Sequence, residues 1–394
     1  QHWDGTCYVV DISGDICQNV AVPNKIIFNP DDMNGALYNI FFPVDMFEND
    51  ADKNEALEQL AFQLMPLETN MTDTSVFFLT EGRKILTAAM ITYYHQGMDF
   101  PQICKRIISS SWSTLFSEID QNGNYEAKQY INSFEGTNEK NIAGCKQACD
   151  SALKLFATNS HVYNAIGRER EGKEAFTPEQ LENKNIFVVI QDSKLELYEP
   201  LVHIITAQCM EYFSNRDNNN QHTILMCLDE FASFGHLEIT PALRKLRKKH
   251  VRIMVLTQSL ADIDLIYGRD ERMAMLNNFA YKIVLGCSDS DTQEYFSRLI
   301  GEKEVYRKAV SKNGKQVTNT RTEAKERIVP PAELARLGRH MILLAEGKYY
   351  KLTKNYYFEL DLWDRVKKCI NNLSRIQEED FSEKNTLSLT DENK

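Results

Sequence analysis

The sequence predicts an α/β protein in which an all-helical segment interrupts a parallel β-sheet that helices cover on both faces. Short apolar runs such as "NIFVVI" (185–190) and "TILMCL" (223–228) alternate with helical patterns after residue 184. Parallel strands that are buried on both faces have this near-continuous apolar character. Between about residues 52 and 175, apolar residues recur only at helical spacing, so this stretch is predicted to be a separate helical insertion.

The composition places the chain among globular proteins with more than one ordinary core. The 394 residues are 43% hydrophobic and 26% charged, and the formal net charge is -11. This charge argues against a protein that coats nucleic acid with its whole surface, but it permits a local strip of basic residues. No run approaches the ~18 apolar residues that a membrane helix needs. The chain starts at Gln1 without a signal peptide, and we expect it to be a fragment of a longer protein.

The first elements in chain order are two predicted strands, at 6–11 and 25–30, and Pro30 ends the second of them. Helical periodicity then marks three stretches, at 73–97, 101–119 and 138–159. We therefore expect residues 1–50 to be the first part of a nucleotide-binding α/β domain and residues 51–180 to be the helical insertion.

Alternation of strands and helices resumes near residue 184 and predicts the remainder of the α/β domain, over 181–375. Strands are expected at 184–192, 223–229, 251–258 and 281–287. A charged helix is expected at 239–250, and "SKNGKQ" (311–316) is typical of a hairpin tip. Residues 376–394 are polar and acidic, and we expect them to form a disordered tail.

Cysteine usage indicates a reducing compartment. The nine cysteines include no CxxC pair, and no partner pair of His or Cys stands near Cys145 and Cys149. An odd count without metal-ligand spacing predicts free thiols in a cytoplasm and no zinc site.

An acid pair, Asp229 and Glu230, follows the strand predicted to begin at residue 223. In ATPases, a strand-end Asp holds Mg²⁺ directly or through water, and the following Glu polarises the water that attacks the γ-phosphate. Taken alone, the pair fits equally well with two acids that end a strand and face solvent.

Two further features favour the nucleotide interpretation. Gln258 ends the next predicted strand, at the edge where open α/β sheets bind ligands, and an amide there can report on a γ-phosphate. "RKLRKKHVR" (244–252) holds six Lys or Arg residues in nine. A solvated helix face explains most of them, whereas Arg247 is a candidate arginine finger for a neighbouring subunit's ATP. The other basic side chains could contact DNA phosphate.

A phosphate-binding loop of the form GxxxxGK[ST] does not occur in the sequence. "GREREGKE" (167–174) matches until Glu174, which replaces the hydroxyl that Mg²⁺ needs. Glu169 and Glu171 would repel phosphate, and a helical segment rather than a strand precedes them. We therefore reject this segment as a phosphate loop.

The motifs resemble those of the coupling ATPases of conjugation and type IV secretion, the TraG/TraD type, over nearly the whole chain. "LDEFASFGHLE" (228–238) is similar to the family's Walker B signature, and "RKKHVRIMVLTQSLADIDLIYG" (247–268) is similar to the block that follows it. "YVVDISGDI" (8–16) resembles the block written Asp-x-Lys-Gly-Glu, except that Ser13 replaces the Lys and Asp15 the Glu.

The resemblance implies a RecA-like P-loop NTPase motor domain, and the predicted insertion stands where the family carries an all-helical domain. In this family the Walker A loop lies upstream of the Asp-x-Lys-Gly-Glu block. The chain is therefore expected to begin just after that loop and to hydrolyse little or no ATP by itself.

The resemblance also implies a role for each site residue. Glu230 would activate the water, Gln258 would sense the γ-phosphate, and Arg247 would act on the ATP of a neighbouring subunit. Three acids at the sheet edge would bind nucleotide and metal: Asp229, Asp11 and Asp15. Of these, Asp229 would hold Mg²⁺, directly or through water.

The function that the resemblance implies is an ATP-driven motor, with ATP and Mg²⁺ as cofactors. A hexameric ring would recruit the relaxase–DNA complex and pump single-stranded DNA into the secretion channel. N-terminal helices absent from this soluble chain would anchor it at the cytoplasmic face of the bacterial membrane. Two alternatives are another hexameric translocation ATPase, such as a channel-assembly ATPase or a chromosome pump, and a non-hydrolysing adaptor that recruits substrates.

Overall fold

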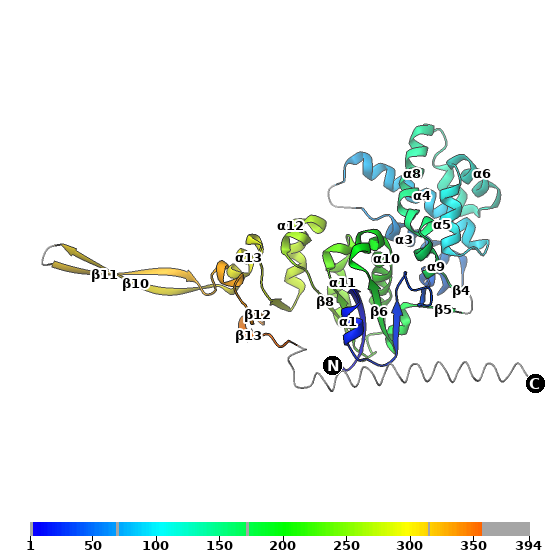
Figure 1. Cartoon of the computed structure of the whole chain (residues 1–394). Helices are drawn as coiled ribbons and strands as arrows, with labels where there is room; N and C mark the ends of the chain where they lie inside the picture. The colour runs from blue at the N-terminus through cyan, green and yellow to red at the C-terminus, as the bar shows by residue number, and fades with distance from the viewer. Residues whose placement is uncertain (1–2, 68–70, 171–172, 314–315, 357–394) are drawn as a thin grey trace, which may run out of the picture. The chain divides into compact units, whose positions relative to one another are not determined.

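A computed structural model describes residues 3–67, 71–170, 173–313 and 316–356 of the chain (Figure 1). The described residues fall into two compact units, which divide after Leu256. The tail predicted at 376–394 lies outside the described residues.

The first unit is built on a five-stranded parallel sheet, as the sequence predicts. The strand order is β2-β6-β1-β7-β8. The strands are β1 (Thr6–Ile12), β2 (Lys25–Phe28), β6 (Asn185–Ile190), β7 (Ile224–Leu228) and β8 (Val251–Val255). β1 lies in the middle, where Tyr8 is in register with Ile186 of β6 and with Met226 of β7.

Helices cover both faces of this sheet (Figure 1). The covering helices are α1 (Asp15–Asn19) and α10 (Leu195–Ser214). On one face, the Tyr8 hydroxyl forms a hydrogen bond of 2.8 Å with Thr206 Oγ1 of α10. On the other face, the next residue back along β1, Cys7, packs in a cluster with Cys17 of α1. Burial on both faces explains why these strands read as continuous apolar runs.

The predicted helical segment is helical in the structure, and a small sheet of order β3-β5-β4 lies where it begins and ends. Its helices are α3 (Asp50–Leu64), α4 (Asp73–His95), α5 (Phe100–Ser109), α6 (Trp112–Asn122), α7 (Tyr125–Asn132), α8 (Glu139–Thr158) and α9 (Ser160–Ala165), and the short helix α2 (Phe42–Asp45) precedes them. The small strands are β3 (Leu37–Tyr38), β4 (Glu169–Arg170) and β5 (Lys173–Phe176). The stretch predicted at 101–119 forms two helices because Ser111 caps the second, accepting a 3.1 Å hydrogen bond from the Thr114 N–H.

Two connecting segments, here called crossings, join the helical segment to the sheet. The outgoing crossing leads from the sheet to the helices and the returning crossing leads back, and Arg168 links the two. Arg168 Nη2, in the returning crossing, lies 2.8 Å from Asp45 Oδ1 in the outgoing one. The Tyr94 hydroxyl donates to the same Asp45 oxygen at 2.8 Å. The guanidinium also lies 5.2 and 4.9 Å from the ring centroids of Phe41 and Tyr94. Ion-pair and cation–π contacts of this kind hold the two crossings in one geometry.

In its described residues, the second unit contains a three-stranded sheet, helices α12, α13 and α14, and a β-ribbon (Figure 1). Its elements are α12 (Leu260–Asn278), β9 (Tyr281–Val284), α13 (Ser290–Ile300), β10 (Glu302–Asn313), β11 (Gln316–Arg327), α14 (Pro331–Leu334), β12 (His340–Ala345) and β13 (Lys348–Thr353). Antiparallel pairing of Asn313 with Gln316 confirms the predicted hairpin, whose residues 314–315 lie outside the described part.

One predicted strand has a different partner from the one expected. The strand predicted at 281–287 was expected in the parallel sheet, whereas β9 pairs antiparallel with β12 in the order β13-β12-β9. Periodicity identifies a short apolar run as a strand but carries no information about its neighbour. Tyr281 and Ile283 of β9 are exposed, unlike the residues of a strand buried on both faces.

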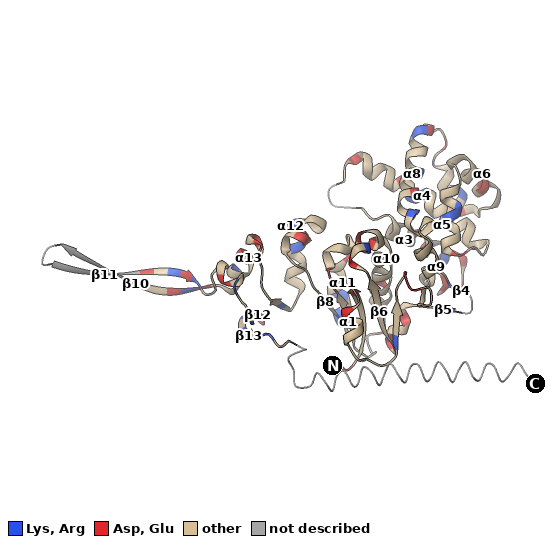
Figure 2. Cartoon of the chain, viewed as in Figure 1, with Lys and Arg blue, Asp and Glu red and all other residues tan. Residues whose placement is uncertain are grey.

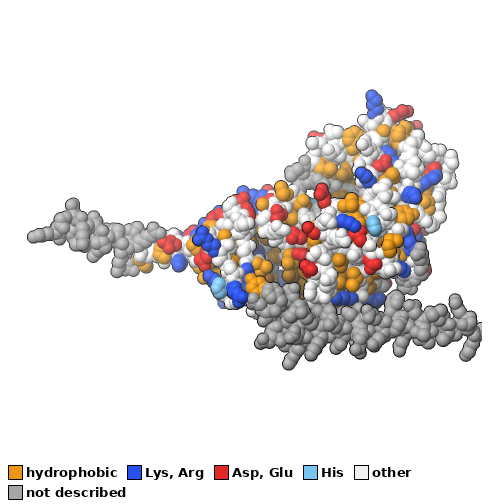
Figure 3. Space-filling model, viewed as in Figure 1, with side chains coloured by type: hydrophobic (Ala, Val, Ile, Leu, Met, Phe, Trp, Pro, Cys, Tyr) orange, Lys and Arg blue, Asp and Glu red, His pale blue; other side chains and the backbone are white. Residues whose placement is uncertain are grey.

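Charged residues of both signs are interspersed along the helical segment (Figure 2) and over the face of the molecule that Figure 3 shows. Such mixing leaves no extended surface of one sign among the described residues on that face. Within the described ranges, no helix has both the length and the apolar character that a bilayer crossing requires.

Candidate functional site

The predicted acids gather at one edge of the parallel sheet. Asp229 and Glu230 follow β7 directly, and Asp11 stands near the end of the adjacent strand β1. The Asp229 N–H donates to the Val10 carbonyl oxygen at 3.4 Å, which brings the two strand ends together. This is the carboxyl edge of the sheet, where open α/β folds bind ligands.

Asp229 is a half-buried carboxyl group in a negative environment. Burial raises the pKa of Asp229 above its ordinary value, and the neighbouring charges of Glu230 and Asp11 raise it further. A hydrogen bond from the Glu230 N–H to Asp229 Oδ1, at 3.2 Å, opposes the increase in pKa. A cation at this edge would therefore be attracted to a carboxylate that the fold leaves without a cationic partner among the described residues.

Asp11 is fully buried, and its carboxylate stabilises the start of α1. Its two oxygens accept hydrogen bonds from the N–H groups of Ile16 and Cys17, at 3.2 and 2.6 Å, in the first turn of α1. Burial raises the pKa of Asp11, although these hydrogen bonds oppose the increase. Asp15 is exposed at the same edge and accepts a 3.2 Å hydrogen bond from Ser13 Oγ. Of the two, only Asp15 has a side chain that solvent reaches.

Glu230 stands in a left-handed backbone conformation, with φ 51°, which is rare for a residue with a side chain. The Phe231 N–H donates to the Leu256 carbonyl oxygen at 2.9 Å, and the Ser233 N–H donates to the Glu230 carbonyl oxygen at 2.8 Å. Phe231 and Phe234 are fully buried. The short turn after the acid pair is thus fixed by two aromatic anchors and by backbone hydrogen bonds.

Gly235 closes this turn in a left-handed backbone conformation, and a side chain there would have to displace the Glu199 carboxylate. Its φ is 68°, and a Cβ atom would lie 2.2 Å from Glu199 Oε1. We expect Gly235→Ala to lower the free energy of unfolding by about 1–3 kcal/mol, measured by urea denaturation. Gly268→Ala is the control, because its φ of 71° is similar but nothing lies within 4 Å. Equal losses in both variants would contradict a close approach at Gly235.

The raised pKa of Asp229 gives a second prediction. Because the folded-state pKa exceeds the ordinary carboxyl value, the charged side chain destabilises the fold as pH rises from about 4 through that raised pKa. We expect Asp229→Asn to raise Tm at pH 7, with the difference disappearing below about pH 4. Asp120→Asn, at an exposed position on α6, is the control. A lower Tm for Asp229→Asn at pH 7 would contradict the prediction.

Arg247 lies at the opposite edge of the sheet from the acids. The charged helix predicted at 239–250 ends earlier: α11 covers Ile239–Leu246, and a 3₁₀ turn, Arg247–Lys249, leads into β8. His250 ends the turn because its φ of 60° is left-handed. The strand β8 alone rises about 17 Å between the two edges. Arg247 is therefore separated from the acid pair of its own chain.

Gln258 follows β8 by three residues and belongs to the second unit. It stands directly before Ser259, which caps α12 by accepting a hydrogen bond from the Asp262 N–H at 3.1 Å.

The segment rejected as a phosphate loop does not precede a helix. Its described residues form the short antiparallel strands β4 and β5, with Glu169 opposite Glu174. In the described part of the chain, no group of three His, Cys, Asp or Glu side chains has the arrangement of a metal site.

Comparison with known proteins gives the family. The sequence model described as "Type IV secretory system Conjugative DNA transfer" matches residues 2–384. The chain belongs to this family. The predicted resemblance to conjugative coupling proteins is thereby confirmed.

Searches by sequence and by structure also find relatives. Protein VirD4 of Agrobacterium fabrum is 23% identical over 195 residues, which are 48% of this chain and 28% of VirD4. The coupling protein TrwB, without its first residues (TrwBdeltaN70), matches with a TM-score of 0.71 and 22% identity. That match covers 89% of this chain and 78% of TrwB. TrwB in complex with the ATP analogue ADPNP matches with a TM-score of 0.70 and 21% identity, over 89% and 79% of the two chains. The predicted fold class, a RecA-like α/β domain with an all-helical insertion, is confirmed by this likeness.

Proposed function

We propose that the complete protein is an ATP-driven coupling protein that recruits a relaxase–DNA complex and moves single-stranded DNA into a type IV secretion channel. The observation that carries the proposal is the half-buried acid pair at the carboxyl edge of a parallel sheet, in a chain of the conjugative DNA transfer family. The chain's match spans 28% of the VirD4 length, so activity, substrates and partners all belong to the proposal.

The residues at this edge fit ATP and Mg²⁺. Asp229 offers carboxylate oxygens, the ligand type that Mg²⁺ prefers. Burial, and then the neighbouring charges of Glu230 and Asp11, raise its pKa, and a divalent cation would stabilise the carboxylate there. When bound, Mg²⁺ neutralises charge on the β- and γ-phosphates. TrwB has been solved with ADP and Mg²⁺, which supports the assignment.

The protein's own residues have separate tasks in this proposal. Glu230 orients and polarises the attacking water, and Asp229 holds the metal, directly or through water. Asp11 fixes α1 beside them, and Asp15 is the exposed acid that can approach the nucleotide. Gln258 senses whether the bound nucleotide carries a γ-phosphate.

Arg247 acts on the ATP of a neighbouring copy in a ring, which we propose to be a hexamer. Its separation from the acids of its own chain supports this assignment. The motor domain comprises 1–50 and 181–375, and the helical domain 51–180 meets the relaxosome. Helices upstream of this chain anchor the protein at the cytoplasmic face of the membrane, next to the secretion channel.

ATP hydrolysis by the complete protein, measured with and without single-stranded DNA, tests the proposal. We expect single-stranded DNA to stimulate hydrolysis, and the stimulation to weaken as salt rises, because phosphate contacts release counterions. Stimulation by duplex DNA alone would favour another translocation motor, such as a chromosome pump. ATP binding without hydrolysis under any condition would favour a non-hydrolysing adaptor.

A further inference from the structure

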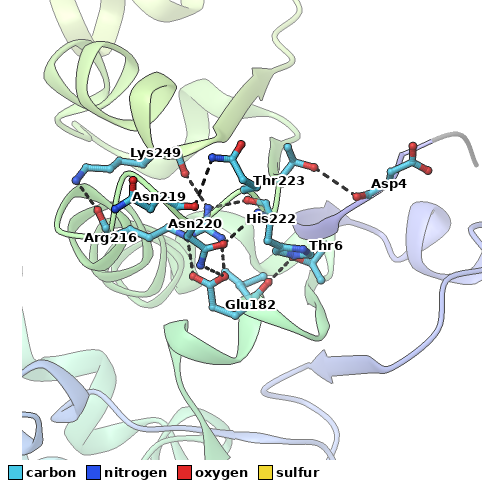
Figure 4. A network of polar contacts seen from close by, with 11 residues as sticks. Asp4, Thr6, Glu182, Arg216, Asn219, Asn220, His222, Thr223 and Lys249 are labelled. Carbon is cyan, nitrogen blue, oxygen red and sulfur yellow. Dashed lines mark hydrogen bonds and ion pairs between the residues drawn. The ribbon is translucent and has the colours of Figure 1, made fainter.

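Arg216 is the centre of a polar cluster at the amino edge of the five-stranded sheet (Figure 4). Its side chain is only 3% exposed. Arg216 Nε donates to Glu182 Oε1 at 2.6 Å, and Nη2 pairs with the other oxygen of the same carboxylate. Nη1 donates to the carbonyl oxygens of His222, at 2.8 Å, and Lys249, at 2.7 Å. One buried side chain therefore connects the segments that precede β6, β7 and β8.

Lys249 is held by Arg216 through both its backbone and its side chain (Figure 4). Its carbonyl oxygen accepts from Arg216 Nη1, and its Nζ donates to the Arg216 carbonyl oxygen. The next residue, His250, accepts a 3.1 Å hydrogen bond from the Ile224 N–H of β7. The 3₁₀ turn Arg247–Lys249 is thus fixed from inside the molecule at its last residue.

The same turn presents Arg247 and Lys248 to solvent. Over the ranges that the structure covers, no ion pair joins either side chain to an acid. A cation whose backbone is fixed by a buried network loses less conformational freedom when it binds an anion than one on a loose loop. The turn therefore holds an exposed cationic side chain in a position where it can bind an anion outside the chain.

We propose that Arg216, paired with Glu182, positions Arg247 for the phosphates of ATP bound by a neighbouring copy of the chain. This inference rests on the function proposed above. Arg216 reaches no phosphate itself and acts through the turn, so it is a positioning residue. Misplacement of a catalytic group by about 1 Å can lower a rate about 10²-fold, which makes a rigid support consequential.

A purely structural role for Arg216 makes a different prediction from a positioning role. If Arg216 only stabilised the fold, its loss would damage the acid pair of the same copy. If it positions Arg247, its loss leaves that copy's acids intact and harms only the neighbour that it should assist. Mixing two defective variants of the complete protein separates these cases.

The experiment combines Arg216→Met with Glu230→Gln. Arg216→Met copies keep the acid pair but present Arg247 poorly, whereas Glu230→Gln copies lack the water-activating acid but keep Arg216 and Arg247. We expect each variant alone to lose at least about 10-fold in DNA-stimulated hydrolysis. An equimolar mixture of exchanging subunits should regain about a quarter of the unmodified rate, because about one interface in four combines an intact acid pair with a well-placed Arg247.

Glu182→Gln is a second variant in case Arg216→Met does not fold, since the amide keeps the size and one acceptor of the carboxylate. We expect a smaller loss of hydrolysis that mixing with Glu230→Gln also restores. Normal hydrolysis by Arg216→Met, or a loss that mixing does not restore in either variant, would overturn the positioning role. Absence of hydrolysis by the unmodified protein would instead overturn the proposed function.

Discussion

Replacing Glu230 with glutamine is expected to lower the rate of DNA-stimulated ATP hydrolysis by about 10²–10⁴-fold, which is the usual contribution of a general base. The amide keeps the shape of the side chain but cannot polarise the attacking water as a carboxylate does. The turn that holds residue 230 depends on backbone hydrogen bonds and on the buried rings of Phe231 and Phe234, so it should persist. Steady-state hydrolysis by the complete protein measures the loss.

Two accompanying measurements make this prediction specific. Binding of a fluorescent ATP analogue should remain within a few-fold of the unmodified protein, because Glu230 acts on the water rather than on the phosphates. Glu238→Gln is the matched control, since Glu238 is an exposed acid eight residues further along the chain. Equal hydrolysis by both variants would mean that the acid pair only ends a strand.

The second large effect is expected at Arg247. An arginine finger contributes about 10³–10⁵-fold to phosphoryl transfer, so Arg247→Ala should reduce hydrolysis by a factor in this range in the assembled protein. Arg247→Lys should recover only part of the rate, because an ammonium group lacks the planar fork of a guanidinium. Hydrolysis at a protein concentration that keeps the ring assembled is the appropriate measurement.

Lys248→Ala is the matched control for Arg247, because Lys248 is an adjacent exposed cation in the same turn. We expect it to weaken DNA binding slightly, if at all, and to leave hydrolysis close to normal. Similar losses for the two variants would show that the turn acts through its total charge. The assignment of a finger to Arg247 would then be wrong.

The sequence predicts the parallel α/β fold well because parallel strands that are buried on both faces have a distinctive apolar pattern. The acid pair could be found in the same way, since it interrupts such a run at Asp229. The partner of β9 could not be predicted, because a short apolar run does not specify its neighbour.

The network around Arg216 could not be predicted from the sequence either. Arg216 belongs to "RDNNNQH" (216–222), a stretch whose composition is that of a solvated loop, yet its side chain is buried. Its partners come from segments up to 34 residues away, such as Glu182. The nucleotide contact that the resemblance implies for Asp11 stays a prediction, and the hydrogen bonds from α1 to its oxygens could not be read from the sequence.

The pairing of the two chain crossings at Asp45 and Arg168 has a mechanical consequence. β3 of the outgoing crossing runs beside β5 of the returning one, with Tyr38 next to Phe176, and the ion pair lies close by in sequence. Tension applied to the helical segment is therefore shared by two lengths of chain side by side rather than carried by one. Rotation of the helical segment about a single connection is therefore opposed by the pairing of the two crossings.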